Sequence, residues 1–218
     1  MTAIKEQPIL FSAPMVRAIL DGTKTVTRRP VKGAGLKWLE QFTPEYVADP
    51  ANSLCPFGKP GERLWVRESF WHAGDWVPTY PEDDTGSWSG TARVHYRADG
   101  EPPNEPNRNY PNGLRNGVYS AAAPANVWRA RPSIHMPRWA CRILLEITDV
   151  RVERLQDISR ADIRAEGLEC PPELASDDVS PNYRDWYPAA WKELWNSTGG
   201  DWDANPWVWV VEFKRVTQ

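Results

Sequence analysis

The chain has 218 residues, enough to bury a full hydrophobic core. Its 26 Lys and Arg residues against 29 Asp and Glu residues give a formal net charge of −3, which excludes a generic nucleic-acid coat held by counterion release. Three widely spaced cysteines exclude a disulfide framework, and no stretch has the pattern of a signal peptide or membrane span, so we expect a cytoplasmic protein with no membrane partner.

The N-terminal region predicts a strand followed by a short helix and a turn. The apolar run Ile9 to Phe11 favours a first strand, and Ser12 before Ala13 and Pro14 is typical of a helix start. Gly22 is expected at the C′ position, because glycine enters the left-handed conformation without a Cβ clash.

The next six residues, KTVTRR, gather reactive polar side chains. Residues two apart share a face of an extended chain, which places Thr25, Thr27 and Arg29 on one face and Lys24, Val26 and Arg28 on the other. A desolvated lysine near other cations loses its proton more easily and can activate a threonine hydroxyl. The alternative is that these cations lie in solvent and the threonines simply suit a strand; the sequence leaves both open.

Further along, Lys37 to Phe42 indicates one helical turn, Gly58 to Glu62 a turn, and Arg63 to Phe70 a strand. In that strand Glu68 shares a face with Leu64 and Val66. A buried carboxylate must be paired, and Arg28 or Arg29 are the candidates.

Residues 71–131 read as a long insertion that contains one strand, Ala92 to Arg97. Many of the 13 tryptophans and 21 prolines of the chain lie in this region, and its polar segments have little apolar surface to offset the entropy of ordering. We expect a lid or a partner-binding flap here, with plain disorder as the alternative.

Regular structure is expected again from Ala140 to Val152, a long strand with a bulge at Asp149. Ser159 caps a short helix that ends at Glu166, and Gly167 stops it. A carboxylate at a helix C-terminus is unfavourable, so a neighbouring cation is expected there.

The chain closes with a helix over Pro188 to Trp195 and a strand over Trp207 to Val216. The strands are too local and the helices too few for a doubly wound sheet. The order therefore favours an α+β fold, a small mixed or antiparallel β-barrel decorated with short helices, in a single domain over residues 1–218.

Four segments together resemble a known family. ILDGTKTVTRR, GERLWVRE, ITDVRVERLQDISRADIRAEGL and WVVEFKRV are similar to the ASCH domain, a member of the PUA-like β-barrel superfamily, in its longer phage and prophage form. The resemblance spans roughly residues 8–70 and 132–216, and it rests on a G-x-K-T-x-T-x-R pattern combined with an E-G pair that closes a later helix. The insertion lies outside it.

The resemblance implies a cleft that accepts a nucleoside or RNA, with RNA favoured over DNA as a partner. Small bacterial members of the family are amidohydrolases that remove the acetyl group of N4-acetylcytidine with a Lys, a Thr and a Glu, and others have been linked to ribonuclease activity or RNA binding. Carried over to this chain, the catalytic residues are Lys24, Thr27 and Glu166, and Arg29 holds the base edge or the oxyanion. The further substrate-binding candidates are Arg28, Trp65, Arg67, Glu68 and Trp139.

Two alternatives stay open. The same cleft would serve a non-catalytic binder of RNA or modified DNA, with phosphate contacts from Lys24, Arg28, Arg29, Arg63, Arg67, Arg138 and Arg142. A metal hydrolase has little support, because no histidine or cysteine pair has ligand spacing, so neither a metal nor another cofactor is expected. The sequence leaves the oligomeric state open.

Overall fold

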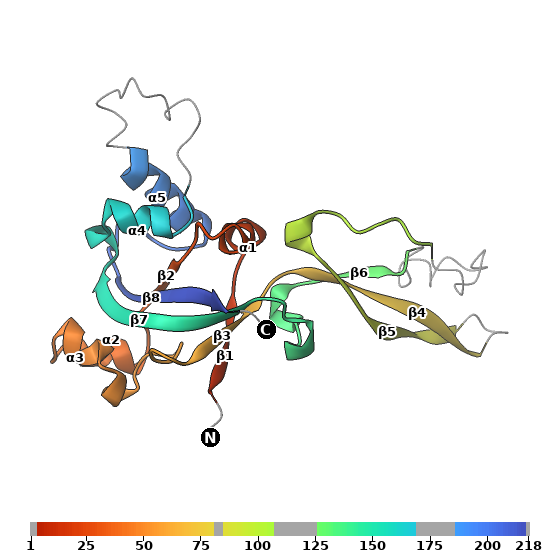
Figure 1. Cartoon of the computed structure of the whole chain (residues 1–218), viewed down its shortest axis with the longest axis horizontal. Helices are drawn as coiled ribbons and strands as arrows, with labels where there is room; N and C mark the ends of the chain where they lie inside the picture. The colour runs from red at the N-terminus through yellow and green to blue at the C-terminus, as the bar shows by residue number, and fades with distance from the viewer. Residues whose placement is uncertain (1–3, 81–84, 107–125, 169–185, 217–218) are drawn as a thin grey trace. The chain divides into compact units, whose positions relative to one another are not determined.

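The structure is a computed structural model that describes residues 4–80, 85–106, 126–168 and 186–216, with the backbone alone described for 76–80, 85–86 and 186–187. It is a mixed α+β protein with few helices, as the sequence predicts, and its described residues form two antiparallel-rich sheets (Figure 1). The chain divides into two compact units, the first formed by Met1–Ile9, Arg17–Trp65 and Ile143–Gln218 and the second by Leu10–Val16 and Val66–Arg142. The whole predicted insertion, residues 71–131, therefore belongs to the second unit.

The first unit holds most of a five-stranded sheet in the order β1-β3-β7-β8-β2, of which Leu10, Val66 and Arg67 belong to the second unit. These strands are β1 (Glu6–Leu10), β3 (Arg63–Arg67), β7 (Leu144–Arg154), β8 (Trp207–Val216) and β2 (Val26–Pro30). β7 and β8 are long antiparallel partners, and their register shifts between Ile147 and Asp149. The bulge predicted at Asp149 is thus confirmed.

Five α-helices and five 3₁₀ turns accompany the strands. The helices are α1 (Ala13–Leu20), α2 (Ala34–Trp38), α3 (Pro44–Ala48), α4 (Arg160–Ala165) and α5 (Trp186–Ser197), and the turns are η1 (Pro50–Asn52), η3 (Arg97–Asp99), η4 (Ser133–His135), η5 (Arg138–Ala140) and η6 (Leu155–Asp157), all within the described ranges. None of these helices is long and apolar enough to cross a membrane.

One buried cluster fixes helices α4 and α5 against the sheet of the first unit. It joins Val26 of β2, Val208 and Val210 of β8, and Leu155, Ile163, Trp191 and Trp195. Ser159 caps α4 by accepting a hydrogen bond from the Asp162 amide at 3.1 Å, as predicted. This packing determines where the end of α4 lies relative to the start of β2.

The second unit contains a three-stranded antiparallel sheet in the order β5-β4-β6. Its strands are β4 (Phe70–Tyr80), β5 (Thr85–Tyr96) and β6 (Trp128–Arg131). The expectation of one strand in a largely irregular insertion was wrong. Gly74 and Gly90 lower strand propensity in the sequence, but here they leave room for rings: a Cβ would lie 2.5 Å from Trp88 Nε1 at the first and 2.4 Å from His72 Cε1 at the second.

Several predicted boundaries also differ. The strand expected over Arg63 to Phe70 is two strands, because the chain leaves the first sheet after Arg67 and enters the second at Phe70. Glu68, between them, donates its amide to the Met136 sulfur at 3.2 Å. The long strand expected from Ala140 begins only at Leu144, since η5 occupies the preceding residues.

Candidate active site

Lys24 and Glu166 meet in the first unit although 142 residues separate them. Lys24 follows the turn at Gly22, whose φ is 79°, and Glu166 is the C-cap of α4. Lys24 Nζ donates to Glu166 Oε2 at 2.5 Å and to the backbone oxygens of Val26 at 2.7 Å and Glu166 at 3.1 Å. Lys24 is only 2% exposed and Glu166 4%, so the alternative of a solvated lysine was wrong.

The backbone holds this pair together as well. The two residues form an antiparallel bridge, and the Thr25 amide donates to the Ala165 carbonyl at 2.8 Å. Gly167 permits the close approach, because its φ is +83° and an added Cβ would lie 3.0 Å from Lys24 Cβ and 2.8 Å from Ala18 Cβ. The pair is therefore set by the chain path and not by side-chain reach alone.

A second cation contacts Glu166. Arg28 Nη1 lies 3.3 Å from Glu166 Oε1, and Arg28 Nη2 lies 2.9 Å from Asp162 and 2.5 Å from Glu153. We expected one cation beside Glu166 at the end of α4, and the structure has two, Lys24 and Arg28. With its side chain fully buried among three carboxylates, Arg28 is a structural partner of Glu166 and not an exposed contact for substrate or phosphate.

Burial lowers the pKa of Lys24, while Glu166 opposes the shift and the charges of Arg29 and Arg28 add to it. The net direction is downward. A buried lysine with nearby guanidinium groups releases its proton more readily than a solvated one. Lys24 thus has the surroundings of a base.

Thr27 is placed differently. In the β2–β8 ladder Arg28 lies opposite Val210, which packs in the α4–α5 cluster, so Thr27 and Arg29 face the other side of the sheet, as the alternation predicts. Thr27 is 2% exposed, and within the described part of the chain no hydrogen bond joins its hydroxyl to Lys24. Lys24 instead donates to the carbonyl of Val26, which is one peptide group from Thr27.

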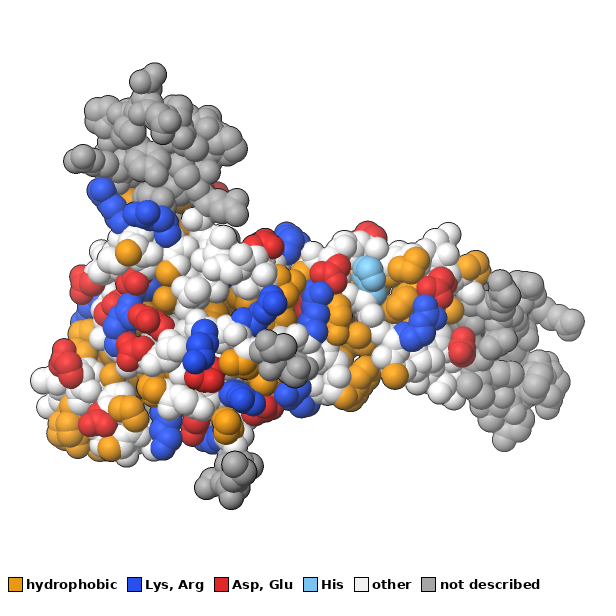
Figure 2. All heavy atoms as spheres, viewed as in Figure 1, with side chains coloured by type: hydrophobic (Ala, Val, Ile, Leu, Met, Phe, Trp, Pro, Cys, Tyr) orange, Lys and Arg blue, Asp and Glu red, His pale blue; other side chains and the backbone are white. Residues whose placement is uncertain are grey.

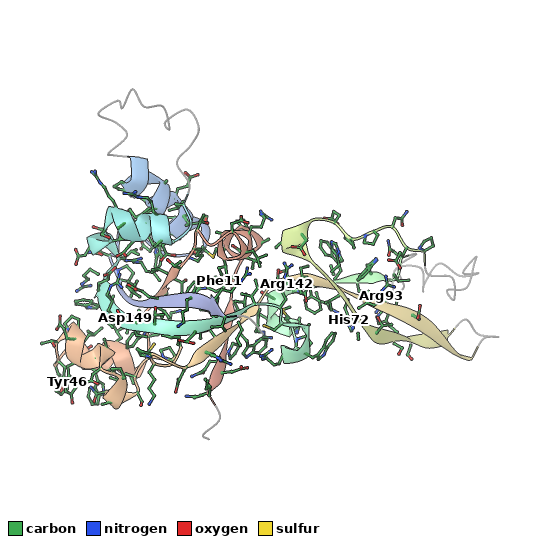
Figure 3. All side chains as sticks on the ribbon, in the orientation of Figure 1. Phe11, Tyr46, His72, Arg93, Arg142 and Asp149 are labelled. Carbon is green, nitrogen blue, oxygen red and sulfur yellow. The ribbon has the colours of Figure 1, made fainter. Side chains whose placement is uncertain are left out.

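Among the further substrate-binding candidates, Arg67, Glu68 and Trp139 belong to the second unit. Glu68, 1% exposed, pairs with Arg142 at 2.8 and 3.0 Å, so the pairing predicted with Arg28 or Arg29 was wrong. Figure 3 labels Arg142 in the second unit, to which Arg67 and Trp139 also belong. Trp65 is a half-buried residue of β3 in the first unit.

Sequence reasoning missed the carboxylates and the second arginine that surround Arg28. Arg151 of β7 bonds to Asp162 at 2.9 Å and to Glu212, and Glu153 lies two residues further on the same face. The alternation of R-V-E in β7 signals a charged face, but only the packing of α4 over that face shows which charges meet.

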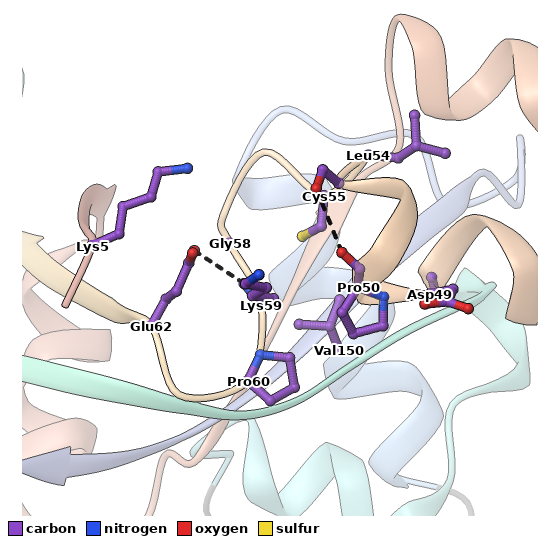
Figure 4. Close-up of a pocket in the computed structure, with 12 residues that line it drawn as sticks. Lys5, Asp49, Pro50, Leu54, Cys55, Gly58, Lys59, Pro60, Glu62 and Val150 are labelled. Atoms are coloured by element: carbon purple, nitrogen blue, oxygen red, sulfur yellow. Dashed lines mark hydrogen bonds between the residues drawn. The ribbon is translucent and has the colours of Figure 1, made fainter. Parts of the chain in front are cut away.

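A separate cavity of about 90 Å³ lies in the first unit, beside α3 and the turn that precedes β3 (Figure 4). It is lined in part by Cys55 and Glu62, and the Lys59 amide donates to Glu62 Oε2 at 3.3 Å. Burial raises the pKa of Cys55 to about 11, so this thiol is a poor nucleophile. The cavity includes none of the predicted site residues.

Among the residues that the structure describes, no three His, Cys, Asp or Glu side chains are grouped to hold a metal ion. Comparisons with family models, with curated proteins and with solved structures found no match for this chain.

Proposed function

We propose that the chain is an ASCH-type amidohydrolase that hydrolyses the amide of an N-acylated nucleoside or base, such as N4-acetylcytidine, free or within RNA. Under this proposal the five-stranded sheet is the family's PUA-like barrel, and the second unit is an elaboration of a single domain. The buried Lys24–Glu166 pair at 2.5 Å carries the proposal, because it unites two distant pieces of the family pattern.

In the proposed reaction the neutral amine of Lys24 takes the proton of the Thr27 hydroxyl, and the Thr27 oxygen attacks the acyl carbonyl. The C–N bond then breaks, and Lys24 returns the proton to the leaving exocyclic amine. Water hydrolyses the acyl-threonine ester and releases the acid, with Lys24 again as the base. Glu166 orients Lys24 throughout.

Turnover requires a local movement, because Lys24 Nζ rests on the Val26 carbonyl at 2.7 Å. To reach the Thr27 hydroxyl, Lys24 Nζ must leave the Val26 carbonyl and move past the peptide group that joins Val26 to Thr27. Arg29 shares the Thr27 face of β2, so under the proposal its guanidinium meets the oxyanion that forms at the attacked carbonyl.

The test is release of cytidine from N4-acetylcytidine by the purified chain, followed by chromatography. We expect turnover by the wild type and a loss of about 100-fold or more in Thr27→Val, since the nucleophile is removed at nearly constant shape. Lys24→Met and Glu166→Gln should lose turnover too. The matched control is Thr25→Val, an exposed position on the same face of the segment, which should keep it.

Two outcomes would overturn the proposal. One is a folded wild type that hydrolyses no N4-acylated cytidine, free or in an oligonucleotide. The other is full turnover by Thr27→Val, which would remove the threonine from the mechanism. Circular dichroism and thermal unfolding of each variant distinguish lost chemistry from lost fold.

A further inference from the structure

The second unit has a feature that the proposed hydrolysis does not use. Facing Arg and Trp side chains stack on its three-stranded sheet: Arg129 on Trp88 at 3.9 Å, Arg93 on Trp128 at 5.0 Å and Arg97 on Trp71 at 5.6 Å. Figure 2 shows cationic, acidic and hydrophobic side chains mixed over this unit. Each stack places a guanidinium group near the face of an indole ring, and Arg93 is also paired with Glu105 at 2.7 Å.

The strand register separates two faces of this sheet. Phe70 lies opposite Arg131 and His72 opposite Arg129, so these four side chains share one face. On this face is a cavity of about 330 Å³, lined by Phe70, His72, Arg131, His135, Pro137 and Trp139. None of these lining residues is acidic.

His72 is held in place within this cavity (labelled in Figure 3). Its Nε2 lies 2.5 Å from the Thr91 carbonyl, and the ring lies over Gly90, where any Cβ would clash. The ring centroids of His72 and Trp139 are 5.9 Å apart. One face of the cavity is thus fixed, and Trp139, 56% exposed, stands at its rim.

Arg131 is exposed, and within the described residues no carboxylate pairs with it. The pKa of Arg129 is lowered by burial and further by the nearby positive charge of Arg131. This contrasts with Arg142, which Glu68 and Asp99 neutralise in the same unit. Arg131 therefore presents its charge at the edge of this face, where an anionic group can reach it.

We propose that this face of β4 and β6 binds single-stranded nucleic acid, with a phosphate at Arg131 and a base stacked on Trp139. A cavity of about 330 Å³ is within the range of pockets for a ligand of nucleotide size. Cationic tracks combined with exposed aromatic rings are the usual means of binding single strands without base pairing. The net charge of −3 means that this local track, not the whole chain, supplies the attraction.

The experiment is fluorescence anisotropy of the full chain with a labelled single-stranded uridine dodecamer at several salt concentrations. We expect salt-sensitive binding, a 5- to 150-fold weaker affinity for Trp139→Ala at about 1–3 kcal/mol per stacked base, and a salt slope reduced by about 0.7 in Arg131→Gln. Both positions are exposed, so the variants should fold.

Matched controls are Lys32→Gln, which removes an exposed cation of the first unit, and Phe42→Ala, which removes an aromatic ring 41% exposed there. Both should bind like the wild type. The proposal is overturned if the wild type binds no dodecamer at low salt, or if the controls weaken binding as much as the two site variants. It is also overturned if a duplex of equal length binds equally well, or if uridine monophosphate displaces the dodecamer at equal concentration. Hydrolysis is not a readout here, so failure of the proposed enzyme activity leaves this test intact.

Discussion

At the scale of single residues, the molecule buries charges that most chains leave in water. Lys24, Arg28 and Glu166 are each less than 5% exposed, and each has a partner of opposite charge. Removal of one member of a buried pair is strongly destabilising, because the other is left desolvated and unpaired. Conservative variants are therefore the informative ones.

The lowered pKa of Lys24 predicts a pH-dependent stability. The unfolded chain keeps this proton up to about pH 10.4, whereas the folded chain releases it at a lower pH. Between the two pKa values the unfolded state binds more protons, so the unfolding free energy rises with pH, by at most about 1.4 kcal/mol per pH unit. Urea unfolding of the wild type and Lys24→Met from pH 7 to 10.5 should show a difference that grows in favour of the wild type; a flat or opposite trend would contradict the shift. Lys32→Met is the exposed control.

The same lysine predicts a pH profile for catalysis under the proposed function. Only the neutral amine accepts the Thr27 proton, so log kcat/KM should rise with unit slope and level off at the pKa of Lys24, below its ordinary value. Initial rates with N4-acetylcytidine from pH 5 to 10 give this curve. A rate that is independent of pH over the whole range would contradict a lysine base.

Glu68 and Arg142 form the corresponding pair in the second unit. Burial raises the pKa of Glu68, and the hydrogen bonds and charge of Arg142 oppose the shift. Arg142→Met should cost about 3 kcal/mol at pH 7, because Glu68 is left buried without its partner. Protonation of Glu68 removes that charge, so the loss should shrink as the pH falls toward 5. Urea unfolding at both pH values measures it, and the double variant Glu68→Leu/Arg142→Met should recover stability.

At the scale of elements, the path of the chain after α4 matters as much as the helix itself. Gly167 ends α4 in the left-handed conformation and lies against Lys24 and Ala18. The C-terminal end of α4 and the segment that leads into β2 are therefore held together by direct backbone contact.

Gly167→Ala should destabilise the chain by more than 1 kcal/mol, through backbone strain and through the clash with Lys24. The matched control is Gly199→Ala, at a φ of +82° with nothing within 4 Å of an added Cβ, which carries the strain alone. Thermal and urea unfolding of both variants distinguish the cost of backbone strain from the cost of the clash with Lys24. Equal losses would show that the approach to Lys24 is unimportant.

At the scale of the whole molecule, two units carry different chemistry. Both units contain a buried ion pair, Lys24–Glu166 in the first and Glu68–Arg142 in the second, and the second unit also carries stacked arginines and tryptophans. Under the two proposals, hydrolysis of a nucleoside and binding of single-stranded nucleic acid depend differently on salt concentration.

Hydrolysis of free N4-acetylcytidine should change less than twofold between 50 and 500 mM salt, because a neutral nucleoside releases no counterions. Binding of the single-stranded dodecamer should weaken steeply over the same range. Parallel measurement of kcat/KM and of anisotropy in one buffer series checks both. Hydrolysis that falls as steeply as binding would show that the two activities share one phosphate-dependent step.

Local features of the chain could be predicted from the sequence. Gly22, the Ser159 cap, the bulge at Asp149 and the bounds of the closing strand Trp207–Val216 follow from turn chemistry, capping and side-chain alternation, which depend on near neighbours. The need for a cation at Glu166 also followed, from the charge of a helix end.

The pairing of distant groups could not be predicted from the sequence and follows from the packing of the folded chain. Glu68 takes Arg142 and not Arg28 as its partner, and Arg28 is enclosed by carboxylates from β7 and α4, because sheet register and helix packing fix these neighbours. The sheet of the second unit was missed because the prolines and polar segments of residues 71–131 indicated irregular structure, whereas the pairing of β4 with β5 and β6 joins residues far apart in the sequence. Pairing between strands and burial of charge are non-local, so no window of sequence contains them.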